Sequence, residues 1–292
     1  MSTKRSSITL PTEVSAEILQ KTQEQSAVMQ LARQITLPGR GVTIPVITGD
    51  PTAAWVNEGA AKPVSDPSLT QKIMQAYKLA VIVPFSNEFK RDLPALYDAL
   101  VARLPLALAQ KFDATCFGNV AAPGDNFDTF ASCTAQSLDK TANSDAYDGL
   151  VAADEDIAIH GGILNGYVIS PQGKGILLGS KDSTGRPLFI NSAAEGAIPM
   201  ILGAKTVPSK AAYKAGSPNV VGVAGDWTQA MYGTVEGVKI DLSDQATLDL
   251  GGGTVINLFQ QNMFAVRAEI ELGFRADTAC FNRLTATGDD SE

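Results

Sequence analysis

The stretch of sequence that decides the fold is residues 55–66, which read WVNEGAAKPVSD. Glycine, proline and short polar side chains make it a turn-rich segment. On one side, apolar and polar positions alternate over residues 42–47, and on the other side residues 70–85 end in the β-branched run VIV at 81–83. Both patterns predict β-strands. Two long strands joined by such a tip form an extended hairpin, which has too little core of its own and needs a partner to pack against.

A helix is predicted on each side of this hairpin. The first covers residues 12–33, with Thr12 as a potential N-cap. The second covers residues 86–117, with Asp92 as a potential N-cap and leucines at three- and four-residue steps. Pro105 lies inside the second helix and is expected to kink it or to divide it into two pieces. A helix of this length would form the spine of the fold.

The second half of the chain predicts short strands that alternate with helices. The expected elements are a helix at 145–160, a strand at 166–170, a helix at 171–178, and strands at 203–207, 220–225, 230–232 and 235–241. This alternation is typical of an α/β subdomain. Residues 251–253 are three glycines, which predict a break. The alternating pattern over 256–284 then predicts one long strand.

Composition limits the possible functions. Hydrophobic residues make up 45% of the chain, enough for a sizeable core. The formal net charge of -8 argues against binding nucleic acid through a general basic surface, but suits a container that encloses DNA without holding its phosphates. No segment is long and apolar enough to span a bilayer, and no signal-peptide core follows Met1. We therefore expect a soluble, intracellular product.

The residues that usually carry catalysis are sparse. The single histidine, His160, is expected at a helix C-terminus, and no Gly-x-Ser-x-Gly elbow accompanies it. Gly173-Lys174-Gly175 lacks the first glycine and the Ser/Thr of a phosphate loop. The carboxylates of residues 154–156 are expected on a solvated helix face. We expect no catalytic residues, no cofactor and no metal.

The cysteines give no sign of a framework. Cys116, Cys133 and Cys280 are widely spaced, odd in number and without a Cys-x-x-Cys pair. This argues against disulfides or a zinc site, and all three are expected to be small buried side chains.

The order of the segments resembles the phage major capsid family with the Hong Kong 97 fold, over nearly the whole chain. The matching stretches are LPTE at 10–13, WVNEGAAKPVSD at 55–66, YVISP at 167–171, KDSTGRPL at 181–188, GDW at 225–227 and RAE at 267–269. Each is weak alone, but their order and spacing together are specific.

The resemblance implies an α+β Hong Kong 97-type capsid fold. Its parts would be an N-terminal arm at 1–39, an extended loop at 40–85, a peripheral domain with the spine helix at 86–144 and 251–292, and an axial domain at 145–250. Pentamers and hexamers would close into an icosahedral virion shell around double-stranded DNA, assembled in the host cytoplasm. Further partners would be a portal protein and separate scaffolding, protease or decoration proteins. Because Met1 lies close to the arm, scaffolding would come from a separate protein or be absent.

The resemblance also implies contacts between subunits. The hairpin residues expected to make them are Trp55, Glu58, Lys62 and Asp66. In crosslinking members of the family, a hairpin lysine joins a neighbour's asparagine in an isopeptide bond, helped by a glutamate. Lys62, Asn262 and Glu269 match these three residues. The alternative is that Asn262 and Glu269 make ordinary hydrogen bonds and ion pairs between subunits, and we prefer it because spacing alone does not establish geometry.

The sequence leaves two other functions open. An encapsulin-like nanocompartment shell would have the same fold and would enclose cargo protein instead of DNA. An α/β enzyme with an inserted hairpin would be a monomer or small oligomer with a buried polar pocket.

Overall fold

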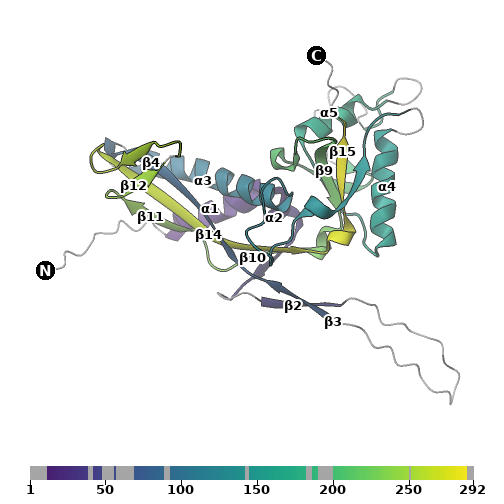
Figure 1. Ribbon diagram of the computed structural model, residues 1–292, viewed down its shortest axis with the longest axis horizontal. Coiled ribbons are helices and arrows are strands. Elements are labelled where there is room, and N and C mark those ends of the chain that lie inside the picture. The colour runs from purple at the N-terminus through teal and green to yellow at the C-terminus, as the bar shows by residue number, and fades with distance from the viewer. Residues whose placement is uncertain are drawn as a thin grey trace.

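The computed structural model describes residues 12–38, 42–47, 56, 69–88, 93–141, 145–181, 186–189, 200–249 and 251–287. The fold is mixed α+β, as expected. Figure 1 shows a long sheet lying along helix α3 on one side, and a separate block that contains α4, α5, β9 and β15 on the other. A two-stranded hairpin, β2 and β3, projects below both parts.

The first part is a five-stranded sheet built around one long strand, β14 (Met263–Ala276). Along one side of β14 runs β4 (Tyr77–Ser86); along the other lie β11 (Lys239–Ser243) and β10 (Ala230–Thr234), all antiparallel to it. Strand β1 (Arg33–Thr36) pairs in parallel with β10. A small hairpin of β12 (Thr247–Asp249) and β13 (Val255–Asn257) precedes β14.

Helix α3 (Leu93–Cys116) packs against this sheet. Its buried side chains Leu100, Leu104, Leu108 and Phe112 recur every four residues and join one core with the inward side chains of β14. The helix is not divided at Pro105, which lies inside it. A proline in a helix removes one backbone hydrogen bond. Burial of the leucines on both sides of it supports the uninterrupted helix.

The helix predicted over 12–33 is instead two helices and the start of a strand. Helix α1 (Thr12–Gln25) is followed by α2 (Ala27–Leu31), and β1 begins at Arg33. At Ser26, with ψ 123°, the backbone is extended, and its hydroxyl accepts from the Met29 amide. The hydroxyl also donates to Asp113 Oδ1 of α3 at 2.5 Å, and Asp113 Oδ2 accepts from Ala27 N at 2.8 Å. This buried tertiary contact competes with helix continuation, which the local sequence does not reveal.

The antiparallel pairing of the two hairpin strands is confirmed, but the second strand is shorter than expected. Strand β2 (Val42–Ile47) pairs antiparallel with β3 (Leu69–Met74). The stretch predicted as one strand over 70–85 is broken after Met74, and β4 begins at Tyr77 in the five-stranded sheet. The predicted N-cap Asp92 lies outside the described residues.

The second part is a six-stranded sheet with helices packed on it. Its order is β5 (Thr134–Ser137), β15 (Phe281–Ala286), β9 (Asn219–Gly225), β6 (Gly166–Ile169), β8 (Ala204–Pro208) and β7 (Met200–Ile201). Helices α4 (Ala146–Ile159) and α5 (Pro171–Gly179) confirm the two predicted helices. Asp145 caps α4 in a capping box, and His160 is its C-cap.

The long strand predicted over 256–284 is wrong. Three strands occupy it, because a turn follows β13 and a 3₁₀ turn at Thr278–Cys280 separates β14 from β15. The Asp277 carboxylate accepts from Ala279 N and stabilises that turn. The strand expected at 235–241 also lies later, at Lys239–Ser243.

The sheets do not follow the sequence ranges closely. Strands β5 and β15 are hydrogen-bonded into one sheet with β6, β8 and β9, whereas β10 and β11 belong to the five-stranded sheet. The expected division into arm, loop, peripheral and axial domains stays a prediction.

Candidate functional site

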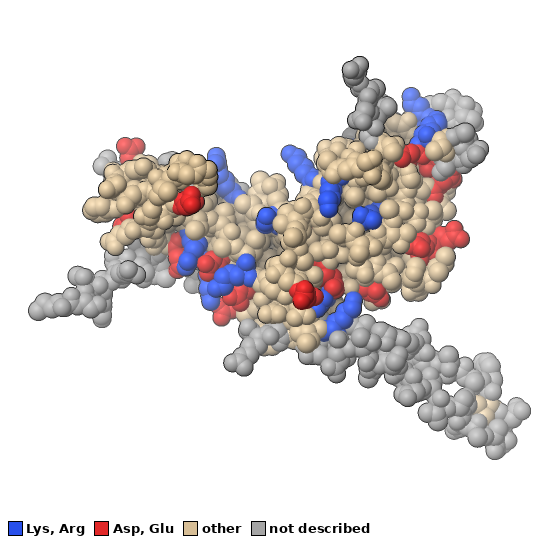
Figure 2. Space-filling model, viewed as in Figure 1, with Lys and Arg blue, Asp and Glu red and all other residues tan. Residues whose placement is uncertain are grey.

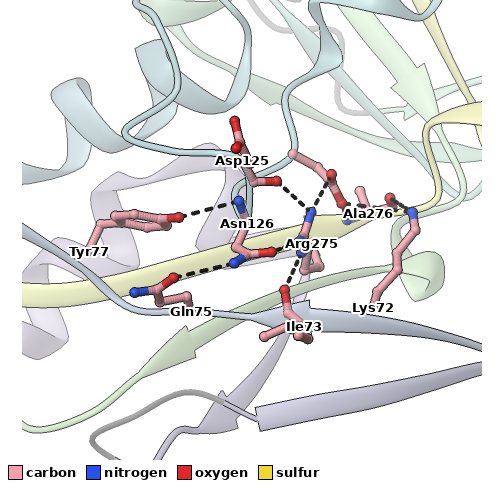
Figure 3. A network of polar contacts seen from close by, with 9 residues as sticks. Lys72, Ile73, Gln75, Tyr77, Asp125, Asn126, Arg275 and Ala276 are labelled. Carbon is pink, nitrogen blue, oxygen red and sulfur yellow. Dashed lines mark hydrogen bonds and ion pairs between the residues drawn. The ribbon is translucent and has the colours of Figure 1, made fainter.

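A buried arginine holds the base of the hairpin against the five-stranded sheet (Figure 3). Arg275 of β14 has a side chain only 10% exposed. Its guanidinium donates from Nε to Ile73 O of β3 at 2.8 Å, from Nη1 to Asp128 Oδ1 at 2.7 Å and from Nη2 to Asn126 Oδ1 at 2.8 Å. A planar guanidinium satisfies several acceptors at fixed angles. One side chain therefore joins the hairpin, the loop after α3 and β14.

Further contacts extend this network. Lys72 of β3 donates from Nζ to Ala276 O at 3.1 Å, and Ala276 N donates to Asp128 Oδ2 at 3.2 Å. Asn126 donates from Nδ2 to Gln75 Oε1 at 3.3 Å. We name Lys72, Asn126, Asp128 and Arg275 the hairpin clamp. It fixes the position from which β2 and β3 leave the rest of the chain.

The outward side of β4 and β11, with that of β14 between Ala265 and Glu271, is a sheet face that no described element covers; we name it the open face. Along β4 the exposed positions are Lys78, Ala80 and Ile82, alternating with half-buried ones. The opposite face packs on α3 in the core. Ile82 is 48% exposed at the middle of the open face, directly opposite Arg267. A single exposed apolar side chain is normal on a protein surface, so this face is distinguished by the row of paired charges in which Ile82 lies.

Charges of both signs occupy the open face. Arg267 donates from Nη2 to Asp241 Oδ2 at 2.7 Å, and its Nε lies 3.2 Å from Glu269 Oε1. Lys78 Nζ lies 3.9 Å from Glu269 Oε2 and 3.8 Å from Glu271 Oε1. In Figure 2, acidic and basic side chains lie intermixed over this part of the molecule. The side chain of Glu269 is 17% exposed and lies between two cations of its own chain.

Asn262 immediately precedes β14 and is held in an uncommon conformation. Its φ is 54°, in the left-handed region that asparagine tolerates. Asn87 Nδ2 donates to Asn262 Oδ1 at 2.7 Å, and Asn87 N donates to Asn262 O at 3.0 Å. The side-chain carbonyl of an exposed amide is thus polarised by a fixed donor.

The structure separates the predicted site residues. Glu269 lies seven residues after Asn262, which separates the two residues by roughly 24 Å along β14 at about 3.4 Å per residue. One chain therefore does not place both side chains at the same lysine. Trp55, Glu58, Lys62 and Asp66 lie outside the described residues, so the crosslink and the hairpin contacts stay predictions.

The hairpin clamp was not predicted from the sequence. Arg275 stands on the outward row of an alternating strand, where a charged residue looks ordinary. The only available signal was the loop GDNFD at 124–128, whose acidic and amide side chains supply acceptors. Its partners in β3 could not be assigned from the sequence.

The cysteines and the histidine lie apart from the hairpin clamp and the open face. Cys116, Cys133 and Cys280 are free and buried, as expected. His160 Nδ1 lies 2.8 Å from the Asp156 carbonyl at the end of α4. Among the described residues no group of three His, Cys, Asp or Glu side chains could hold a metal, and no described helix is long and apolar enough to cross a membrane.

Comparisons with known proteins agree with this architecture. The sequence model of the phage capsid family matches residues 6–277. The "Probable major capsid protein gp17" of Mycobacterium phage L5 is 32% identical over 280 residues, which cover 89% of this chain and 84% of that protein. The "Major capsid protein" of Staphylococcus phage 80alpha is 26% identical, covering 94% and 84%.

Solved structures give the same fold. A chain from Gordonia phage Cozz superposes with a TM-score of 0.71 at 20% identity, covering 91% of this chain and 87% of that one. A chain from "Capsid of empty GTA particle computed with C5 symmetry" has a TM-score of 0.66 at 14% identity, covering 90% of both.

Proposed function

The chain belongs to the phage capsid family, and from that premise we propose that its open face receives the hairpin of a neighbouring subunit in the shell. The protein is a structural major capsid protein of a tailed phage, a virion component that forms the icosahedral shell, and not an enzyme. The phage relatives favour a genome container over an encapsulin-like nanocompartment.

The open face carries this proposal. It is a three-stranded surface with an exposed apolar centre and charges of both signs, left uncovered by the described part of its own chain. The hairpin needs such a surface because an isolated two-stranded hairpin is marginally stable in water. Its tip carries Glu58, Lys62 and Asp66 at four-residue steps, so acidic and basic groups alternate there too. Alternating charges on both surfaces fix the register of the contact more than its strength.

The hairpin clamp supports the same proposal. Figure 1 shows β2 and β3 projecting away from the two sheets, and the clamp lies where they depart. A buried arginine with three strong acceptors makes this base rigid. Rigidity at the base lowers the entropy lost when the hairpin docks on a neighbour.

The finer parts of the assembly follow from the family resemblance. We infer pentamers and hexamers enclosing double-stranded DNA, with a portal protein and separate scaffolding, protease or decoration proteins as partners. The division into arm (1–39), loop (40–85), peripheral domain (86–144 and 251–292) and axial domain (145–250) belongs to this proposal. The net charge of -8 supports enclosure of DNA without sequence-specific binding.

Exchange of one open-face side chain tests the docking. Ile82→Arg adds bulk and charge at the centre of the open face and is expected to abolish shells while the subunit stays folded. Leu106→Arg is the matched control, because Leu106 is 46% exposed on α3, which packs on the other side of the sheet. Electron microscopy of both variants shows whether shells form, and circular dichroism shows whether the subunits are folded. Normal shells from Ile82→Arg would refute the docking.

The second candidate function is a covalent crosslink between the hairpin and its neighbour, which the hydrogen bond from Asn87 to Asn262 favours. The amine of Lys62 would attack Cγ of Asn262 in another subunit, the Cγ–Nδ2 bond would break, and ammonia would leave. The Asn87 donor on Asn262 Oδ1 would stabilise the negative charge that forms on that oxygen. Glu269, which would accept the lysine proton, must then come from a different chain than Asn262, because of their separation along β14.

The non-covalent contact remains our preferred reading, because Glu269 is already paired with Arg267 and Lys78 of its own chain. Boiled denaturing gels of particles separate the two. A single band excludes the crosslink and leaves the non-covalent contact, which Ile82→Arg tests. A ladder that disappears in Lys62→Ala establishes the crosslink, and a ladder that persists in this variant excludes Lys62 from it.

A further inference from the structure

The outer side of helix α4 carries an apolar stripe that no described element covers. Tyr147, Val151 and Ile159 lie on one side of the helix at multiples of four residues, and Ile159 is 73% exposed. Ile163 follows the helix and is 78% exposed. The buried side of the helix is Ala146, Leu150, Ala153 and Ile157. Helix α4 is therefore apolar on two sides, whereas a helix on a protein surface normally has one apolar face.

A second exposed apolar corner lies at the other end of the same sheet. Met200 of β7 and Leu202 of the β7–β8 turn are 60% and 44% exposed. Lys205 is exposed and pairs directly with Met200 across the two strands. Helix α4 packs on β5 and β15, the first two strands of the sheet, whereas β7 is the last. Six strands at about 4.8 Å spacing separate the two edges by roughly 24 Å.

The two sequence regions that contain these patches have opposite charge. Residues 141–173 contain five acidic residues and no lysine or arginine. Residues 174–214 contain six lysines and arginines against two acidic residues. Figure 2 shows acidic side chains along the edge where α4 lies and basic side chains on the side of α5. An α4–α4 contact would set acidic surface against acidic surface, so charge favours pairing of the unlike ends.

We propose that the α4 stripe of one subunit docks on the Met200–Lys205 corner of the next subunit, head to tail, around a ring. Two different patches on each copy make a heterologous contact, which closes into a ring when the rotation permits. Glu155 lies between Val151 and Ile159 on the stripe and meets Lys205 of the next subunit, with apolar side chains around this pair. The proposal rests on the proposed function, and it names the surfaces that build the pentamers and hexamers.

A charge exchange in the full chain tests the pairing. Glu155→Lys and Lys205→Glu are each expected to raise the concentration needed for capsomer formation at least tenfold. The double variant is expected to return within about threefold of wild type, since the pair is restored with its charges reversed. Asp154→Lys is the control, because Asp154 lies on α4 about 100° away from Glu155. Loss of assembly in Asp154→Lys equal to that in Glu155→Lys, or no recovery in the double variant, would overturn the proposal.

A cysteine pair reports the direction of the contact. Under mild oxidation with copper phenanthroline, Val151→Cys together with Leu202→Cys should give a ladder of dimers, trimers and larger species on non-reducing denaturing gels. Each single variant should stay monomeric, because the three native cysteines are buried. Dimers from Val151→Cys alone would mean an α4–α4 contact and would refute the ring.

These tests separate the two proposals. Ring contacts act within a capsomer, so Glu155→Lys should weaken the formation of capsomers themselves, whereas Ile82→Arg acts on hairpin docking. Normal shells from Glu155→Lys, with shells lost in Ile82→Arg, would sink the ring interface alone. If the wild-type chain forms neither capsomers nor shells, the proposed function fails first.

Discussion

Arg275 is expected to be the largest single polar contribution to the anchoring of the hairpin. Arg275→Met keeps most of the buried stem but removes three hydrogen bonds of 2.7–2.8 Å. Breaking a buried ion pair costs about 3–5 kcal/mol. The side chain of Asp128 is 20% exposed and keeps Ala276 N and Lys72 as partners, which places the loss near the lower end. We expect the free energy of unfolding to fall by about 3 kcal/mol.

Urea unfolding of unassembled subunits measures this loss, with hydrogen exchange of the β3 amides as a local readout. Exchange at β3 should rise more than exchange in the six-stranded sheet, because no clamp residue lies in that sheet. A double-mutant cycle with Asp128→Ala should give a coupling of about 1.5–3 kcal/mol, the range for a hydrogen bond to a charged group. A loss below about 1 kcal/mol, or additivity of the two variants within about 0.5 kcal/mol, would refute this account of the clamp.

Two further predictions concern the arm and the helices. Burial raises the pKa of Asp113 to about 6 from 3.8, so its contribution to stability is fully present below about pH 4 and is lost as the pH rises through 6. Relative to Asp113→Asn, urea unfolding should show the wild type losing about 3 kcal/mol between pH 4 and 8, and a constant difference would contradict this. Gly149→Ala should lower the Tm despite the better helix propensity of alanine, because its Cβ would lie 2.0 Å from the Ser137 carbonyl oxygen. Gly175→Ala in α5 meets nothing within 4 Å and should raise the Tm slightly; the opposite order of the two melting points would contradict the packing argument.

Elements with a single buried face and a clear boundary were predicted well from the sequence. Helix α4 begins after its N-cap Asp145 and ends before Gly161, whose φ is 80°. The pairing of β2 with β3 followed from alternation on both sides of a turn-rich tip. In each case the local pattern and the tertiary structure favour the same boundary.

The sequence did not predict where one continuous alternating pattern divides into two strands that belong to different sheets. The pattern continues from β3 into β4 and from β14 into β15, although each pair of strands belongs to different sheets. Alternation reports that one face is buried, but not which strand lies beside it. Likewise the break at Ser26 depends on Asp113, which lies 87 residues away.

The candidate site was predictable only in part. The resemblance named Asn262 and Glu269, and their role in a crosslink stays a prediction. Their separation along β14 became visible only with the strand in place. The open face and the α4 stripe depend on which side chains the fold leaves uncovered, and no local pattern distinguishes such positions from ordinary surface.

A cryo-electron microscopy map of particles formed by this chain tests the central claim most directly. We predict that the hairpin of each subunit lies across β4, β14 and β11 of its neighbour, with Ile82 covered at the contact. A map in which the hairpin folds back onto its own subunit, or in which the open face is exposed to solvent in the closed shell, would contradict it.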